Sequence, residues 1–115
     1  MVVDDEPDIR GLVHLVLDLS DDDIAVVAEA ATAAEGLARW REERPEVIVL
    51  DDHMPGGRGI DLAEAILAEC RSQRVILFSA SLDDTTVERA DRIGVRCLSK
   101  ERLAELPDII REAAD

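Results

Sequence analysis

The sequence predicts an α/β fold, with one parallel five-stranded sheet and helices on both of its faces. Short runs rich in Val, Ile and Leu alternate along the chain with longer segments whose apolar residues recur at helical spacing. Strands that alternate with helices in this way form parallel sheets. The chain has 115 residues, enough for one core and too few for two, so we predict a single domain over residues 1–115.

Five strands are predicted from short apolar runs bounded by polar, proline or glycine residues. In chain order they are residues 1–3, 24–28, 46–50, 74–79 and 95–98. The first run is unusually short for a strand. Either the chain starts late or upstream residues have been lost, and the sequence does not distinguish these explanations.

Five helices are predicted from apolar residues at helical spacing. In chain order they are residues 8–19, 32–44, 60–70, 83–94 and 101–114. Thr32 and Glu35 form a capping box at the start of the second helix, and Asp83 or Asp84 can cap the fourth. Residues 54–59, which precede the third helix, are predicted to be a loop because they are too rich in Gly and Pro to be helical.

The charge balance limits the partners of this chain. It has 13 Lys and Arg against 27 Asp and Glu, a net charge of −14, which argues against direct nucleic-acid binding and favours cations and basic partner surfaces. Cys70 and Cys97 have no metal-ligand spacing and are predicted to be reduced core residues. We recognise no signal peptide and no apolar run of membrane length, so we expect a cytoplasmic protein without membrane contact.

Polar residues that could carry chemistry lie at the ends of four predicted strands. Asp4 and Asp5 follow the first strand, Asp51 follows the third, Ser79 closes the fourth and Lys100 follows the fifth. Ligands of open parallel sheets bind at the carboxyl ends of strands, so we expect these residues to converge on one pocket. Carboxylates suit Mg²⁺ or Mn²⁺, and an aspartate can be a nucleophile in phosphoryl transfer. Taken alone, the acidic run that begins at Asp4 is more simply explained as a solvated turn that caps the next helix.

Four short motifs occur in order along the chain: Val3-Asp4-Asp5-Glu6-Pro7, Val49-Leu50-Asp51 with Met54-Pro55-Gly56 and Gly59, Phe78-Ser79-Ala80, and Leu98-Ser99-Lys100. They resemble the motifs of the receiver domain of two-component response regulators, the CheY-like family. Each motif is weak alone, but four in order over essentially the whole chain are specific. The resemblance implies a doubly wound (βα)5, flavodoxin-like sheet with the strand order 2-1-3-4-5.

The resemblance also implies a role for each acidic residue. Asp51 would accept a phosphoryl group from a phosphohistidine on a sensor histidine kinase or phosphotransfer protein, because Met54 follows it at the family's spacing. Asp5 and Asp51 would ligate Mg²⁺ (or Mn²⁺) directly, together with the backbone carbonyl of His53. Asp4 would act through a bound water.

The remaining two site residues are implied to transmit the signal. Ser79 and Lys100 would hold the phosphoryl oxygens and communicate phosphorylation to the surface of the fourth helix, fifth strand and fifth helix. Such a protein is not an enzyme in the usual sense, because it catalyses only its own phosphorylation and dephosphorylation. The output domain or target protein is unknown: a stand-alone regulator and a segment of a DNA-binding regulator both fit. The last two helices would be the surface for a phosphorylation-dependent homodimer.

Four residues depart from the family pattern. Asp52 occupies a usually apolar position and is expected to be a solvent-facing acid of little consequence, rather than a charge that weakens phosphorylation. His53 is expected to be an exposed loop residue, with a role in positioning water as the alternative. Glu101 replaces the usual proline, which predicts a trans peptide bond before it. Cys97 replaces the Tyr or Phe of many receivers, so output would rely on movement of loop 79–84 or be weak.

Two other functions compete with a phosphorylatable receiver. A pseudo-receiver would use the same fold as a phosphorylation-independent interaction module, although retention of all five pocket residues argues against it. A small phosphohydrolase with an aspartyl nucleophile would need a substrate cap and a second acid at the usual spacing, and the sequence has neither.

Overall fold

The computed structural model describes residues 1–114, so the last residue of the predicted domain 1–115 lies outside the described residues. Its main sheet has five parallel strands in the order β2-β1-β3-β6-β7. These strands are β1 (Val2–Val3), β2 (Glu29–Ala30), β3 (Val47–Leu50), β6 (Arg74–Ser79) and β7 (Arg96–Ser99). In terms of the five predicted strands this order is 2-1-3-4-5, which confirms the predicted fold class.

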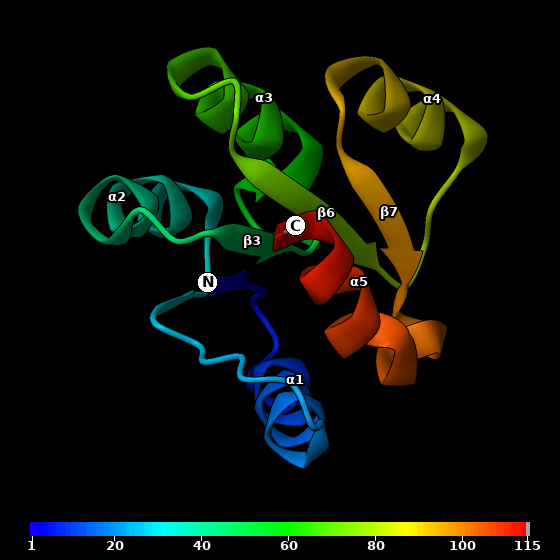
Figure 1. Cartoon of the computed structure of the whole chain (residues 1–115). Helices are drawn as coiled ribbons and strands as arrows, with labels where there is room; N and C mark the ends of the chain where they lie inside the picture. The colour runs from blue at the N-terminus through cyan, green and yellow to red at the C-terminus, as the bar shows by residue number, and fades with distance from the viewer. Residues whose placement is uncertain (115) are drawn as a thin grey trace.

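Helices cover both faces of this sheet. They are α1 (Pro7–Leu19), α2 (Ala33–Glu43), α3 (Gly59–Glu69), α4 (Asp84–Ile93), the 3₁₀ helix η1 (Lys100–Glu105) and α5 (Leu106–Ala114). Figure 1 shows α1 and α5 on one side of the sheet, with α2, α3 and α4 on the other. Within residues 1–114, no helix has the length and apolar character needed to cross a membrane.

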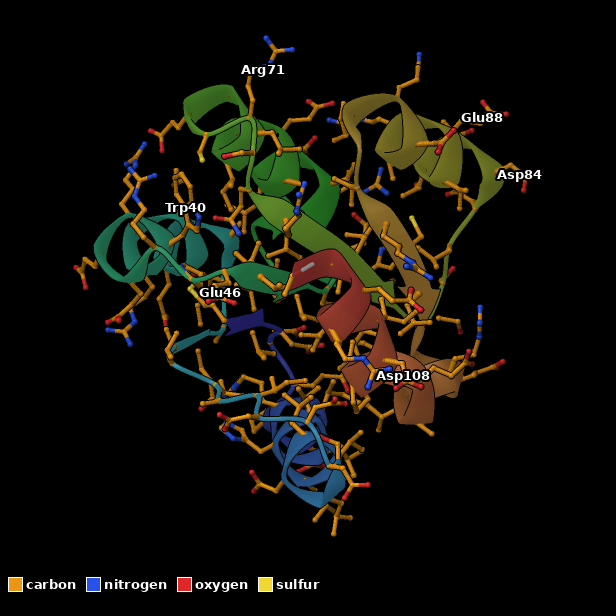
Figure 2. The ribbon with its side chains drawn as sticks, viewed as in Figure 1. Trp40, Glu46, Arg71, Asp84, Glu88 and Asp108 are labelled. Atoms are coloured by element: carbon orange, nitrogen blue, oxygen red, sulfur yellow. The ribbon has the colours of Figure 1, made fainter. Side chains whose placement is uncertain are left out.

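Two apolar clusters, one on each face of the sheet, form the core. Successive strand residues point to opposite faces, so Ile48 and Leu50 belong to one cluster and Val49 to the other. The cluster under α2, α3 and α4 contains Trp40, which is fully buried and extends from α2 (Figure 2). Its indole N–H donates to Oε1 of Gln73 at 2.9 Å, so the only Trp of the chain is buried without an unpaired donor.

Thr32 and Asp83 are confirmed as the capping residues of α2 and α4. The hydroxyl of Thr32 accepts a hydrogen bond from the backbone N–H of Glu35 at 3.1 Å. The carboxylate of Asp83 accepts one from the backbone N–H of Thr86 at 2.7 Å. Both helices therefore begin where a side chain satisfies one of their unpaired N–H groups.

The predicted strand over residues 24–28 is wrong, because β2 contains only Glu29 and Ala30. Side chains 24 to 30 nevertheless alternate between more and less buried, as in a strand. The backbone N–H of Val2 also donates to the carbonyl of Ala28 at 3.1 Å. A strand needs a neighbour, and β1 supplies only two paired residues, so segment 24–27 stays extended without a ladder.

The loop 54–59 is not helical before Gly59, as predicted: β4 (His53–Met54) and β5 (Gly57–Arg58) form a small antiparallel hairpin with Gly56 at φ 84° in its turn. One further prediction differs from the structure. The last predicted helix, 101–114, is split into η1 and α5. Pro107 causes this split, because it has no backbone N–H to donate to the carbonyl of Leu103. In a continuous α-helix its ring would also clash with that carbonyl.

Candidate functional site

Three of the predicted site residues meet at the carboxyl end of the sheet. The Nζ atom of Lys100 lies 2.8 Å from Oδ2 of Asp4 and 3.3 Å from Oδ1 of Asp51. The two carboxylate side chains are only 2% and 4% exposed, and that of Lys100 is 11% exposed. β1 and β3 are hydrogen-bonded neighbours, with Val3 paired to Leu50, so the residues that follow them emerge side by side.

The surroundings of these three groups perturb their protonation. Burial and the nearby charge of Asp4 raise the pKa of Asp51, and they outweigh the opposing effects of Lys100 and of a backbone hydrogen bond from His53. Burial alone would lower the pKa of Lys100, but its hydrogen bonds and charge interactions with Asp4 and Asp51 outweigh burial and raise it. The site therefore combines a poorly solvated carboxylate with a fixed positive charge.

The acidic run after β1 offers a set of oxygen ligands. Asp4, Asp5 and Glu6 can each contribute one carboxylate oxygen, and these atoms lie within 4.8 Å of one another. Oδ1 of Asp5 is buried and has no hydrogen-bond partner among residues 1–114. An unsatisfied buried oxygen costs about 1–3 kcal/mol, and a hard cation would satisfy it. The donor set therefore fits Mg²⁺ or Mn²⁺, and Glu6 is a potential ligand that the sequence reasoning did not include.

Ser79 lies at the same edge of the sheet, with its hydroxyl engaged locally. It is fully buried at the end of β6 and pairs in register with Ser99. Its Oγ donates to the carbonyl of Ser81 at 3.2 Å and accepts from the N–H of Ser81 at 3.4 Å. The hydroxyl therefore holds the start of the β6–α4 loop in this structure.

His53 is exposed, as expected from the sequence. Its Nε2 atom lies 3.1 Å from the carbonyl oxygen of Ser81, so it connects the loop after Asp51 to the loop after Ser79. Both loops border the site, and His53 spans them at its rim.

The expectation that Asp52 faces solvent is wrong, because its side chain has 0% exposure. Its Oδ1 accepts a hydrogen bond from the backbone N–H of Ile60 at 3.1 Å, and its Oδ2 pairs with the guanidinium of Arg58. Arg58 in turn donates to Oγ1 of Thr86 at 2.9 Å. The acid lies under the first turn of α3, where unpaired N–H groups favour a carboxylate. Arg58, a cation in the same loop, was the sequence signal that could have indicated its partner.

Gly59 allows α3 to begin directly against Asp51. A Cβ atom at this position would lie 2.0 Å from the carbonyl oxygen of Asp51, far inside contact distance. The position of the loop that carries Asp51 therefore depends on a residue without a side chain.

The remaining departures from the family pattern are as expected in their geometry. No peptide bond among the described residues is cis, so the bond before Glu101 is trans, as predicted. Cys97 is half-buried and packs against the core cluster beneath α4. Cys70 and Cys97 are both free thiols.

Comparison with known proteins identifies the family. The model of the response regulator receiver domain matches residues 1–111. The chain is 38% identical, over an alignment of 123 residues, to a protein-glutamate methylesterase/protein-glutamine glutaminase of Agrobacterium fabrum, covering 99% of this chain and 34% of that protein. It is 37% identical over 84 residues to the DNA-binding transcriptional activator DevR/DosR of Mycobacterium tuberculosis, covering 73% of this chain and 38% of that protein. The chain thus spans well under half the length of either relative.

Solved structures agree with this assignment. A two-component response regulator of the LuxR family from Aurantimonas sp. SI85-9A1 superposes with a TM-score of 0.89 at 31% identity, covering 99% of this chain and 82% of that one. The response regulator domain of Thermotoga maritima CheB superposes with a TM-score of 0.88 at 26% identity, covering 98% and 92%. From its sequence, its fold and the residues at its strand ends, this chain belongs to the response regulator receiver domain family.

Proposed function

We propose that this receiver domain, over residues 1–115, accepts a phosphoryl group on Asp51 and thereby switches a partner-binding surface. The observation that carries the proposal is the position of Lys100, whose ammonium bridges the nearly buried carboxylates of Asp4 and Asp51. A nucleophile deprived of water beside a fixed cation suits phosphoryl transfer, in which positioning and charge stabilisation supply most of the catalysis.

We propose that Mg²⁺ (or Mn²⁺) is held directly by Asp5, Asp51 and the backbone carbonyl of His53, and through water by Asp4. The unpartnered buried Oδ1 of Asp5 and its proximity to other carboxylate oxygens support this assignment. When bound, the ion would neutralise charge on the phosphoryl oxygens.

In the proposed transfer, a carboxylate oxygen of Asp51 attacks the phosphorus of a phosphohistidine on a sensor kinase or phosphotransfer protein. An O–P bond forms and the P–N bond breaks, and the leaving imidazole nitrogen takes up a proton from solvent. Lys100 would then pair with a phosphoryl oxygen, and the hydroxyl of Ser79 would leave Ser81 to donate to another. The domain would act in this way only on its own aspartate, and not on a free substrate.

The output surface in this proposal consists of α4, β7 and α5. Lys100 directly follows β7, and the loop after Ser79 leads into α4, so both phosphoryl-binding groups adjoin this surface. Asp84 and Glu88 lie on the outer side of α4 (Figure 2), which favours a basic partner surface. The named functions of the two relatives suggest an output domain or target protein as that partner, while the net charge of −14 argues against direct nucleic-acid contact. We place the protein in the cytoplasm, where its two free thiols would stay reduced.

Incubation with Mg²⁺ and acetyl phosphate, followed by intact-mass measurement, tests the proposal. The wild type should gain one phosphoryl group and Asp51→Asn should gain none. Asp52→Asn should still gain one, because its acceptor Asp51 is intact. A folded wild type that forms no adduct and does not bind beryllofluoride, a phosphoryl mimic, would contradict the proposal. That outcome would favour a phosphorylation-independent interaction module.

A further inference from the structure

Asp52 is a buried acid that the proposed phosphoryl chemistry does not use. Its side chain has 0% exposure and lies next to Asp51 in the chain. A buried carboxylate is strongly unfavourable unless it is fully paired, so its partners are a necessary part of the fold. Those partners are the backbone N–H of Ile60, at 3.1 Å, and the guanidinium of Arg58.

Arg58 extends this interaction to the start of α4. The Nη2 atom that pairs with Asp52 also donates to Oγ1 of Thr86 at 2.9 Å. Thr86 is 3% exposed, and the carboxylate of Asp83 binds its backbone N–H at 2.7 Å. The hydrogen bond to Asp52, with the nearby charges of Asp83 and Asp61, raises the pKa of Arg58, which keeps the guanidinium charged. A continuous path of polar contacts therefore runs from the residue after Asp51 to the first turn of α4.

A second arginine holds the same two helices together without contacting this path. Arg89 of α4 binds Asp61 at 2.6 Å and Glu64 at 2.8 Å, and both acids belong to α3. Like Arg58, Arg89 pairs with acidic side chains, and it joins α4 to α3, the helix that begins directly after Arg58. Its contacts do not include Asp52, so Arg89 is a matched control for Arg58.

We propose that Asp52 and Arg58 are positioning residues that couple the state of Asp51 to the start of α4 through Thr86. The inference rests on the proposed phosphorylation of Asp51. Because Asp51 and Asp52 share a peptide unit, any shift of the loop on phosphorylation also moves Asp52. Its buried carboxylate cannot separate from Arg58 without losing the guanidinium that pairs with its Oδ2 atom, so the shift reaches Thr86. This path needs no aromatic ring, which Cys97 cannot provide.

Amide hydrogen exchange in residues 84–93, with and without Mg²⁺ and beryllofluoride, tests the coupling. Thr86→Val keeps the size and branching of the side chain and leaves the Asp52–Arg58 pair intact. We expect beryllofluoride to change exchange in α4 of the wild type, and this change to fall at least about five-fold in Thr86→Val. Arg89→Gln should exchange faster in both states yet keep the wild-type response. Coupling is reciprocal, so the affinity of Thr86→Val for beryllofluoride should also change, by about five-fold.

Three outcomes would overturn the inference. In the first, the exchange of α4 in Thr86→Val responds to beryllofluoride as in the wild type. In the second, Arg89→Gln loses as much of the response as Thr86→Val, which would mean that the response depends only on the packing of α3 against α4. The double variant Asp52→Asn/Arg58→Gln, which leaves no buried charge unpaired, should also lose the response, and a full response there would contradict the path.

The wild type separates this inference from the proposed function. A wild type that binds beryllofluoride without any change in α4 would overturn the coupling and leave phosphorylation of Asp51 standing. A wild type that neither binds beryllofluoride nor gains a phosphoryl group would overturn both.

Discussion

Asp51 is held in an environment that opposes its charge. Burial and the neighbouring charge of Asp4 raise its pKa, and Lys100 offsets these effects only in part. A carboxyl whose pKa is raised in the folded state contributes stability that is present below its unfolded pKa and is lost as the pH rises through the folded pKa. Above the folded pKa that contribution is gone, so the charged form of Asp51 carries a cost in stability, as expected of a group retained for the proposed chemistry.

Asp51→Asn should therefore stabilise the metal-free protein. We expect the free energy of unfolding, measured by urea denaturation at pH 7, to rise by about 1 kcal/mol. Mg²⁺ should stabilise the wild type, because it binds only the folded state, and should stabilise Asp51→Asn much less. Glu88→Gln, on the exposed outer side of α4 and beyond its first turn, is the control and should change neither quantity. A less stable Asp51→Asn that responds fully to Mg²⁺ would show that Asp51 neither bears this cost nor ligates the ion.

The sequence predicted this part of the site well because strand ends are a property of topology. Asp4, Asp51 and Lys100 follow strands whose carboxyl ends must lie at one edge, and the structure brings them together. The surroundings of Asp52 were not predictable in the same way. Its burial depends on α3 and α4 closing over it, which no pattern of neighbouring residues specifies.

Among the elements, the start of α3 depends most on a single residue. The first turn of α3 passes so close to Asp51 that a Cβ atom on Gly59 would lie 2.0 Å from its carbonyl oxygen and 2.8 Å from its carbonyl carbon. Both atoms belong to the backbone, so they cannot move away as a flexible side chain would. The loop that carries the proposed phospho-acceptor would have to shift instead.

Gly59→Ala should consequently lower both stability and phosphorylation. We expect a loss of about 3 kcal/mol in the free energy of unfolding, at the high end for overpacking, and slower adduct formation with acetyl phosphate. Gly11→Ala is the matched control, because its Cβ would meet no atom within 4 Å in the interior of α1. Alanine is the better helix former there, and a gain of about 0.5–1 kcal/mol is expected. Equal effects of the two substitutions would mean that the close approach at Gly59 is unimportant.

Local signals predicted most of the elements, whereas the strand over residues 24–28 failed because it depends on a neighbouring strand. The caps at Thr32 and Asp83 need only a side chain near its own helix, and both are present. Segment 24–28 has the composition of a strand, but forming one requires a partner. Pro107 was a local signal that should have predicted the break between η1 and α5.

At the scale of the whole molecule, a cavity of about 640 Å³ lies at the amino ends of the strands, away from the proposed phosphorylation site. Apolar residues from five parts of the chain line it, among them Met1, Leu17, Ile24, Val47 and Ile110. Charged residues also border it, namely Asp22, Asp23, Glu43, Arg44, Glu46 and Arg111. β1 lies between β2 and β3, and the cavity continues the line of β1 beyond Met1, between the extended segment 24–27 and the start of β3. The cavity therefore has the position that additional residues of β1 would occupy.

The amino group of Met1 should make stability depend on pH. It donates to the carbonyl of Val47 at 2.9 Å, and burial lowers its pKa from 8.0 to about 6. A depressed pKa contributes stability that is present above the unfolded pKa and is lost as the pH falls through the folded pKa. Between pH 8 and pH 6 the free energy of unfolding should fall by about 2 kcal/mol, as urea denaturation of protein with Met1 retained would measure. Acetylation of the amino group should remove this dependence, and a dependence that survives acetylation would contradict the assignment.

Filling the cavity from Met1 should convert segment 24–27 into a strand. Four apolar β-forming residues, such as Val-Ile-Val-Leu, placed before Met1 would lie between this segment and the start of β3. Each buried side chain contributes about 1.5–3 kcal/mol against about 1–2 kcal/mol of backbone entropy, so a net gain of about 2 kcal/mol is expected. The leader Gly-Ser-Gly-Ser is the control: it also moves the charged amino group away from Val47, but it cannot fill the cavity. Both leaders should abolish the dependence on pH, but the apolar one should stabilise the protein more than the control does, and only the apolar one should protect amides 24–27 from exchange. Equal stability of the two would mean that the cavity is not a place for a strand.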